Sequence, residues 1–380
     1  MNGILCIAVW MAITSLFWGC GGDASGSIPE ANVITGEPCN LQLKGTRTIS
    51  PDQSGGQKVL FTDFERGPDG TVYLLDGRNV RLYMFDKGGN LKREILAPGD
   101  GPGEYPPHPK LQILNGNLWI LGMRKVGKFT LDGQLLEEYK MANFYRCKRM
   151  INDRQFVATL EALAPKGSGS FTFNKLVGLV EFQNEELKKT YIEAPDLGKL
   201  VILLPEKRSA SVTLGTKILH DLLFAVDTGT GTIFYANSAG YTIYKQQLNQ
   251  NSPEKISVQY DPQPFSPENK RYVAQAIRGI PDAAKKQIEE KLPDFLPAIH
   301  EIRVLDSGHL LVRRVTGLRN SVCDILEPNG NFKCSFQIGG QLKPRQLKMY
   351  GATVATIEET DDGNLYREYN IENYRQIFAN

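Results

Sequence analysis

Pairs of cationic and amide side chains recur in short turn sequences of this chain, and they are its clearest candidates for ligand binding. Arg78-Asn79 and Arg319-Asn320 each stand seven residues before an acidic side chain. The full candidate set is Arg78, Asn79, Arg124, Lys125, Arg319 and Asn320. Converging guanidinium groups would favour a carboxylate, a phosphate or an acidic glycan. The alternative is that each Arg bonds backbone carbonyls and a nearby acid, while each Asn accepts a left-handed turn conformation.

Histidine is the second residue type that could carry chemistry, and the chain has 4. His220 and His300 stand near equivalent points of two repeats and could converge on a metal ion, although the sequence identifies no third ligand. His108, in a Pro-rich loop, and His309, in a Ser-Gly turn, are predicted to be surface residues. The chain has no Cys/His zinc spacing and no GxSxG nucleophile motif. We therefore assign no catalytic residue and predict no cofactor.

Regular turn sequences predict the elements that must position these side chains. Residues 61–105 contain short β-rich stretches separated by Gly- and Asn-containing turns, which is typical of consecutive hairpins. Similar units return at 110–139, 148–191, 222–248, 299–338 and 345–371. Self-similarity at roughly 40 to 60 residues is typical of a radial array. The sequence therefore predicts one all-β domain, a six-bladed β-propeller, with residues 40–50 supplying the strand that the last unit lacks.

The first unit, followed by GDGPGEY at 99–105, resembles the bacterial six-bladed β-propeller lipoproteins, which are distant relatives of NHL-repeat propellers. That group carries a helical excursion before the fifth blade. Segment 266–292 fits it, because Ser266 suits an N-cap, Pro267 a first helical position, and Pro281 the start of a second helix. The resemblance implies fold and location but no catalytic motif. Related propellers include metal-dependent lyases and lactone hydrolases, so a metal-dependent hydrolase or lyase acting at the central channel is the alternative function.

The N-terminus predicts export. Residues 4–18 form an uncharged apolar run of 15, shorter than a membrane span and typical of a signal-peptide core. Gly19-Cys20 at its end resembles a lipoprotein signal, in which Cys20 becomes the lipidated first residue. A secretory signal cleaved nearby and an uncleaved anchor are the alternatives. We accordingly divide the chain into a signal at 1–20, a tether at 21–38 and the propeller at 39–380, located in the periplasm or at the outer membrane.

Export also bears on the cysteines, because an oxidising compartment permits disulfides. Of 6 cysteines, Cys6 and Cys20 belong to the leader. Cys323 and Cys334 flank a turn at 327–330, and a hairpin closed there would bring them nearly opposite one another as a disulfide. The alternative is that both are small buried hydrophobic residues. Cys39 and Cys147 have no local partner, so their pairing stays open.

Composition narrows the function classes. A hydrophobic content of 41% with 37 Gly and 21 Pro is typical of an ordered, turn-rich domain. A formal charge of +2 gives no indication of nucleic-acid binding. The sequence as a whole predicts an exported, lipid-anchored, monomeric propeller that binds a protein, peptide or glycan, with anionic ligands favoured, and that does not catalyse a reaction.

Overall fold

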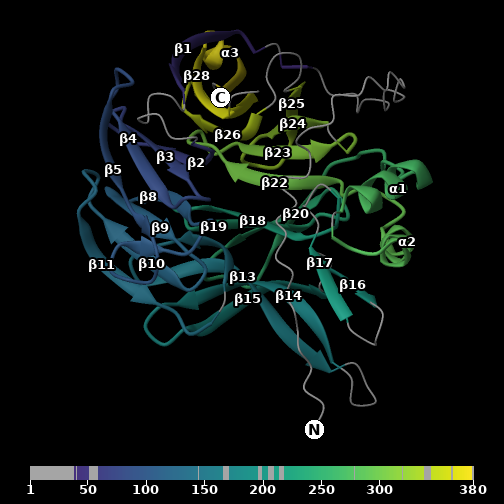
Figure 1. The fold of residues 1–380 in the computed structure, drawn as a ribbon. Coiled ribbons are helices and arrows are strands. Elements are labelled where there is room, and N and C mark those ends of the chain that lie inside the picture. Colours follow the sequence, from purple (N-terminus) through teal and green to yellow (C-terminus); the bar gives the residue numbers. More distant parts are fainter. Residues whose placement is uncertain are drawn as a thin grey trace.

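The computed structural model describes residues 38–39, 41–50, 59–143, 145–165, 171–195, 199–203, 209–213, 218–277, 279–318, 320–337, 344–360 and 363–378. Six antiparallel four-stranded sheets form a ring (Figure 1), as predicted for a six-bladed β-propeller. Each sheet is one blade, and in blades 1 to 5 the first strand along the chain is the innermost one.

The strands of blades 1 to 3 follow the chain in order. Blade 1 contains β2 (Phe61–Arg66), β3 (Val72–Asp76), β4 (Arg81–Phe85) and β5 (Leu91–Ile95). Blade 2 contains β8 (Lys110–Leu114), β9 (Asn117–Leu121), β10 (Lys125–Phe129) and β11 (Leu135–Lys140). Blade 3 contains β12 (Arg146–Met150), β13 (Gln155–Pro165), β14 (Phe171–Glu181) and β15 (Glu186–Pro195).

Blades 4 and 5 keep this order, and blade 6 does not. Blade 4 contains β18 (Leu222–Asp227), β19 (Thr232–Asn237), β20 (Thr242–Gln247) and β21 (Glu254–Ser257). Blade 5 contains β22 (Ile299–Val304), β23 (Leu310–Val315), β24 (Ser321–Leu326) and β25 (Phe332–Gln337). Blade 6 contains β26 (Pro344–Tyr350), β27 (Thr353–Thr360), β28 (Gly363–Ile371) and, as its outermost strand, β1 (Leu43–Ile49). The prediction that segment 40–50 completes the last blade is therefore confirmed.

Short elements lie between the blades. β6 (Ala97–Pro98) pairs in parallel with β7 (Glu104–Tyr105), and β16 (Lys199–Leu203) pairs antiparallel with β17 (Ser209–Thr213). Helices α1 (Pro267–Ala276) and α2 (Asp282–Lys291) precede blade 5, as predicted, and α3 (Tyr374–Phe378) ends the described chain. Ser266 caps α1 by accepting a 3.2 Å hydrogen bond from the Asn269 N–H. None of the described helices is long and apolar enough to cross a membrane.

Aspartate side chains fix the turns that the sequence predicts. In the turn after β4, one Asp86 oxygen accepts hydrogen bonds from the Gly88 and Asn90 N–H groups at 2.8 and 2.9 Å. Gly89 in the same turn has φ +85°, which costs glycine little because it has no Cβ. Because a nearby side chain accepts these hydrogen bonds, the chain can reverse direction without leaving backbone N–H groups unsatisfied.

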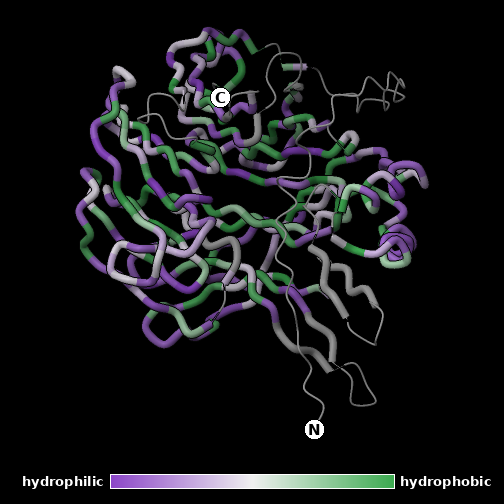
Figure 2. The backbone as a smooth tube through the Cα atoms, viewed as in Figure 1, coloured by the Kyte–Doolittle hydropathy of each residue, from purple (hydrophilic) through white to green (hydrophobic). Residues whose placement is uncertain are grey.

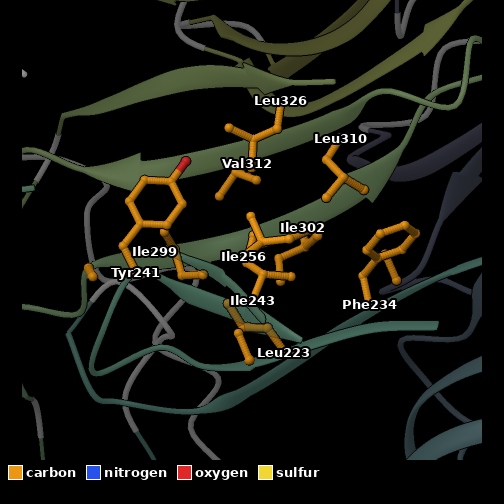
Figure 3. Close-up of a cluster of buried hydrophobic side chains, with 13 residues drawn as sticks. Leu223, Phe234, Tyr241, Ile243, Ile256, Ile299, Ile302, Leu310, Val312 and Leu326 are labelled. Atoms are coloured by element: carbon orange, nitrogen blue, oxygen red, sulfur yellow. The ribbon is translucent and has the colours of Figure 1, made fainter. Parts of the chain in front are cut away.

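The core lies between neighbouring blades, where apolar side chains of one sheet face those of the next. Figure 3 shows the cluster between blades 4 and 5, in which Ile243 and Phe234 from blade 4 meet Ile302, Leu310 and Val312 from blade 5. Hydrophobic residues follow the strands inside the sheets, and hydrophilic residues gather in the outer turns and on the helices (Figure 2). The helical insertion has its own apolar cluster, which includes Val273, Ile288 and Val315.

The propeller has two unlike faces. On one, which we call the connector face, inter-blade connectors contact the turns between the second and third strands of the blades. The His108 N–H donates to the Gly77 carbonyl at 2.6 Å, and the Met141 N–H donates to the Arg124 carbonyl at 2.7 Å. On the other, which we call the turn face, the first turn of a blade lies beside its third. In blade 1, Gly70 lies in the first turn and Asp86 in the third, and Arg47 of β1 donates to the carbonyls of both.

The disulfide differs from the predicted one. Cys334 is bonded to Cys39, and Cys323 is a buried free thiol. The predicted pairing of Cys323 with Cys334 is wrong because the register of the hairpin, which puts Leu326 opposite Phe332, does not bring the two cysteines opposite one another. Cys334 therefore lies opposite Ile325, and Cys323 opposite Phe336. The alternative of a small buried residue holds for Cys323 alone. Cys6 and Cys20, the second of which is the predicted lipidation site, lie outside the described residues.

Candidate functional site

In the turn after β3, one predicted binding residue has a structural role and the other is available to a ligand. Asp76 accepts hydrogen bonds from the Arg78 and Asn79 N–H groups, both at 3.0 Å, and from the Asn79 amide at 2.8 Å. The hydrogen-bonding groups of Asn79 are therefore used within the turn, as expected from the alternative that Asn79 serves as a turn residue. The Arg78 side chain is exposed, and its guanidinium forms no ion pair with a residue that the structure describes. Arg78 is thus the available member of the pair.

Lys125 has a structural role in place of the predicted one. Its side chain is only 6% exposed, and its ammonium donates to the Gly101 carbonyl at 2.6 Å and to the Glu104 carbonyl at 2.8 Å. The same group lies 2.7 Å from Glu138 and 5.0 Å from the centre of the Tyr105 ring. Lys125 therefore fastens the GDGPGEY connector to blade 2, and it is not open to a ligand.

The remaining predicted binding residues are spread over the connector face. Arg124 is exposed in the turn between β9 and β10, and its carbonyl accepts from the next connector. Asn320 is exposed before β24, where its N–H donates to the Gly317 carbonyl at 3.3 Å. Arg319 lies outside the described residues. Blade 6 separates Asn320 from Arg78, so only Arg78 and Arg124, in adjacent blades, belong to one half of the face.

The histidines do not form a metal site with other described residues. His220 is half-buried, and its Nε2 lies 3.3 Å from the Phe295 carbonyl of the helical insertion. Burial lowers the pKa of His220, and this contact opposes the shift. His300 is buried in β22 beside Glu301. Within the described part of the chain, no three His, Cys, Asp or Glu side chains gather closely enough to hold a metal.

His309 corrects a prediction. It is fully buried on the turn face, not on the surface, and its ring meets the Phe378 ring edge-on at 5.6 Å. The C-terminal helix α3 covers it, and this contact between residues distant in sequence could not be seen in the local Ser-Gly turn.

An ionic cluster on three inner strands was missed by the sequence analysis. We call it the inner-strand cluster, and its members are Asp63 and Glu65 on β2, Glu301 and Arg303 on β22, and Lys348 and Tyr350 on β26. The Lys348 ammonium lies 3.1 Å from Asp63 and 2.9 Å from Glu65, and the Tyr350 hydroxyl donates to Glu65 at 3.0 Å.

Glu301 forms the second half of the cluster. Its carboxylate lies 2.5 Å from the Arg303 guanidinium and 3.1 Å from that of Arg313 on β23. The Glu301 and Arg303 side chains are 22% and 27% exposed, so this half keeps contact with solvent. Carboxylates and cations alternate throughout, and each carboxylate has a cationic partner.

The charges set the protonation of the carboxylates. Burial alone would raise the pKa of Asp63, but Lys348, with Lys110 farther along, holds that pKa at about 2. Burial likewise opposes ionisation of Glu301, but Arg303 and Arg313 hold its pKa at about 2. Both side chains are therefore ionised at neutral pH. A general acid needs a pKa near the working pH, which neither group has.

A signal for this cluster does exist in the sequence. The inner strands read FTDFER, IHEIRV and PRQLKMY, with polar residues at the same two alternate positions: Asp63 and Glu65, Glu301 and Arg303, and Gln346 and Lys348. Each strand has a register irregularity immediately before the first of these positions. Aligning the inner strands of the repeats, instead of their turns, would have found it.

A shallow pocket lies on the turn face, away from the cluster and from the predicted binding residues. Its lining residues are Asn115, Asn152, Asp153, Arg154, Gln155 and Glu181. Asn152 is used by the turn, since its side chain accepts from the Arg154 and Gln155 N–H groups. Asp153 is paired with Lys128 at 2.6 Å. Most of its polar groups are thus already satisfied.

Comparisons with known proteins agree with the fold. The model of the DUF5128 family, described as a 6-bladed beta-propeller, matches residues 66–161. A solved structure from Bacteroides fragilis, described as a "putative exported protein", is similar with a TM-score of 0.54 at 12% identity, covering 88% of this chain and 98% of that one. A DUF4221 family member from Bacteroides vulgatus gives 0.53 at 8% identity, covering 87% and 98%. No curated protein matches the sequence. The family match and the two solved structures agree with the six-bladed propeller fold of this chain.

Proposed function

We propose that this chain is an exported, lipid-anchored propeller that binds an anionic ligand on its connector face without converting it. The observation that carries the proposal is the exposed Arg78 guanidinium, which no described residue pairs, in a turn whose own carboxylate, Asp76, is occupied. Lys110, also exposed and without an ion pair to a described residue, begins the next inner strand two residues after His108. Because the His108 N–H bonds the Gly77 carbonyl, these two cations border the same contact.

Such an arrangement suits an anion for physical reasons. A guanidinium donates two parallel hydrogen bonds to a carboxylate or phosphate, and it is not neutralised at any physiological pH. Arg124 on the adjacent blade adds a third exposed cation. A protein, a peptide or a glycan that carries carboxylates is the expected partner, and the chain acts as a monomer.

Export is supported by the Cys39–Cys334 disulfide, because such bonds persist in oxidising compartments. It is also supported by the fold-level similarity to a Bacteroides protein described as exported. We place the protein in the periplasm or at the outer membrane, held through Cys20. A Cys20→Ser variant should move from the membrane to the soluble fraction, and retention at the membrane would contradict the lipid anchor.

A binding role is also supported by the protonation of the inner-strand cluster. Asp63 and Glu301 are held ionised by cations, with pKa values of about 2, and so are not poised for proton transfer at neutral pH. The alternative, a metal-dependent hydrolase or lyase using His220 and His300, draws no support from the contact of His220 with the Phe295 carbonyl. Metal analysis of the purified protein tests it, and a stoichiometric ion would favour it.

The binding proposal is tested with three anionic probes: a fluorescent oligoglutamate peptide, polygalacturonate and inorganic phosphate. The Arg78→Ala variant should keep the urea unfolding midpoint and weaken binding of the preferred probe about 10-fold, as expected for loss of charged hydrogen bonds. Arg154→Ala is the matched control, since it removes an exposed cation from the turn face. Equal loss in both variants, or no binding of any probe, would contradict the proposal.

A further inference from the structure

The ring is closed by a strand that only hydrogen bonds and a few side chains hold. β1 pairs with β28 alone, from Leu43 opposite Ile371 to Ile49 opposite Tyr366, with an irregularity between Gly45 and Arg47. Its side chains are mostly exposed, and Ile49 is the buried one. Arg47 pairs with Glu368. An outermost strand with so little buried surface is expected to open locally before the rest of its blade.

A second connection reaches the same strand from a different blade. Cys39, shortly before β1, is bonded to Cys334 of β25, and their Cα atoms lie 5.3 Å apart. The Cys39 N–H donates to the Ser335 carbonyl at 2.6 Å, and Pro38 forms an isolated parallel bridge with Ser335. β25 belongs to blade 5 and β1 to blade 6, so the disulfide spans the boundary between two blades.

Both ends of the described chain meet at this boundary. The Gln42 N–H donates to the Asn373 side chain at 3.0 Å, and the Glu372 N–H donates to the Gln42 carbonyl at 2.9 Å. Cys39, Cys334 and Phe378 belong to one buried cluster. Figure 1 shows α3 beside β1 and β28. The disulfide therefore sits where the two chain ends could separate, and not inside a continuous hairpin.

We propose that the Cys39–Cys334 bond is a covalent second closure of the ring, which keeps β1 beside β28 whenever their ladder opens. With the bond, β1 is tethered at both ends, through residues 40–42 to the disulfide and through residues 50–60 to β2, so its re-pairing occurs at a higher effective concentration. Without it, only the C-terminal end of β1 stays tethered, through residues 50–60, when the ladder opens. The bond encloses a sequence separation of 295 residues, the kind of long loop for which a disulfide restricts the open ensemble most.

The closure depends on the compartment. To form the bond, two thiols lose two protons and two electrons to a protein disulfide of the exchange type, which becomes a dithiol. In a reducing environment, the ring would rely on the β1–β28 ladder and on the contacts of Arg47 and Ile49. This inference concerns the ring itself and is independent of the ligand-binding proposal.

Hydrogen exchange tests the inference in the whole propeller. The Cys39→Ser/Cys334→Ser variant should raise the exchange rate of the β1 amides about 100-fold relative to those of β9 in blade 2, in line with typical disulfide contributions. Added reductant should produce the same change in the native protein and none in the variant. Cys323→Ala, which removes the buried thiol and keeps the bond, is the control, and it should leave the β1-to-β9 ratio unchanged.

Two results would overturn the inference. One is an unchanged β1-to-β9 ratio in the reduced protein, which would show that the ladder holds without the bond. The other is an equal rise in both strands, which would mean that the bond stabilises the whole fold and not the closure. If the double variant fails to fold, exchange after reduction of the already folded native protein distinguishes the same outcomes.

Discussion

The contact between blades 6 and 1 adds buried charges to an apolar core, in which the Phe64 ring meets the Tyr366 ring, whereas the core between blades 2 and 3 is apolar and rich in aromatic rings. In the first, Lys348 lies between Asp63 and Glu65, and all three side chains are at most 11% exposed. In the second, the Tyr139 ring of blade 2 stacks on the Phe182 ring of blade 3 at 5.0 Å, and the Phe156 ring lies 4.8 Å from Phe182. An ion pair between Lys128 and Asp153 also crosses the second contact, but Asp153 is 49% exposed.

The difference follows from where the chain is continuous. Blades 2 and 3 are consecutive in sequence, and apolar contact between consecutive blades needs little directional guidance. At the boundary of blades 6 and 1, a sheet made from both ends of the chain must meet the first sheet in one register. Buried ion pairs are directional and costly when misplaced, so a slipped register would leave buried charges without a partner. We infer that the inner-strand cluster specifies register at this seam more than it adds stability.

The largest expected effect comes from Lys348→Met. Removing the ammonium leaves two carboxylates buried without their shared cation, which should lower the free energy of unfolding by about 3–5 kcal/mol. Urea denaturation of the native and variant proteins measures the loss.

The triple variant Asp63→Asn/Glu65→Gln/Lys348→Met separates register from stability. With all three charges neutralised, most of the lost free energy should return, because no buried charge is left unpaired. A triple variant as unstable as Lys348→Met alone would show that the cluster itself stabilises the seam, and the comparison with blades 2 and 3 would lose its basis.

The fold was accessible to sequence analysis because turn residues are local. Asp86 and Gly89 act within one turn, so their spacing predicts hairpins, and repeated hairpins predict blades. The helical insertion was found for the same reason, through Ser266 and Pro267. The closing role of β1 followed from the need to remove an exposed edge.

The sites were less accessible because they depend on contacts between distant residues. Lys125 looked like a free cation, since the carbonyls that it binds lie in the preceding connector. Cys334 appeared to have a hairpin partner, since its actual partner, Cys39, lies 295 residues away in the sequence. Asn79 behaved as its local sequence suggested, and Arg78 is exposed because Asp76 is held by Asn79 and the backbone.

Acid should weaken the ionic contact by a smaller amount. The folded pKa of Asp63 is about 2, below the ordinary value of 3.8, so its stabilisation is present above about pH 4 and is lost as the pH falls toward 2. The difference in unfolding free energy between the native protein and Asp63→Asn should therefore narrow by about 2 kcal/mol over this range. Glu301 titrates in both proteins, so its contribution cancels from the difference in unfolding free energy. A difference that stays constant with pH would show that Asp63 is not held ionised by Lys348.

The smallest expected effect is in the aromatic contact. Phe156→Leu keeps an apolar side chain of similar volume but removes the ring that Tyr145 and Phe182 face, so we expect a loss of about 1–1.5 kcal/mol. Because this contact consists of aromatic rings, urea unfolding should give the same loss of unfolding free energy at pH 7 and pH 3, and in low and high salt. A loss that changes with pH would mean that charges shape this contact as well, and the two interfaces would then differ in degree and not in kind.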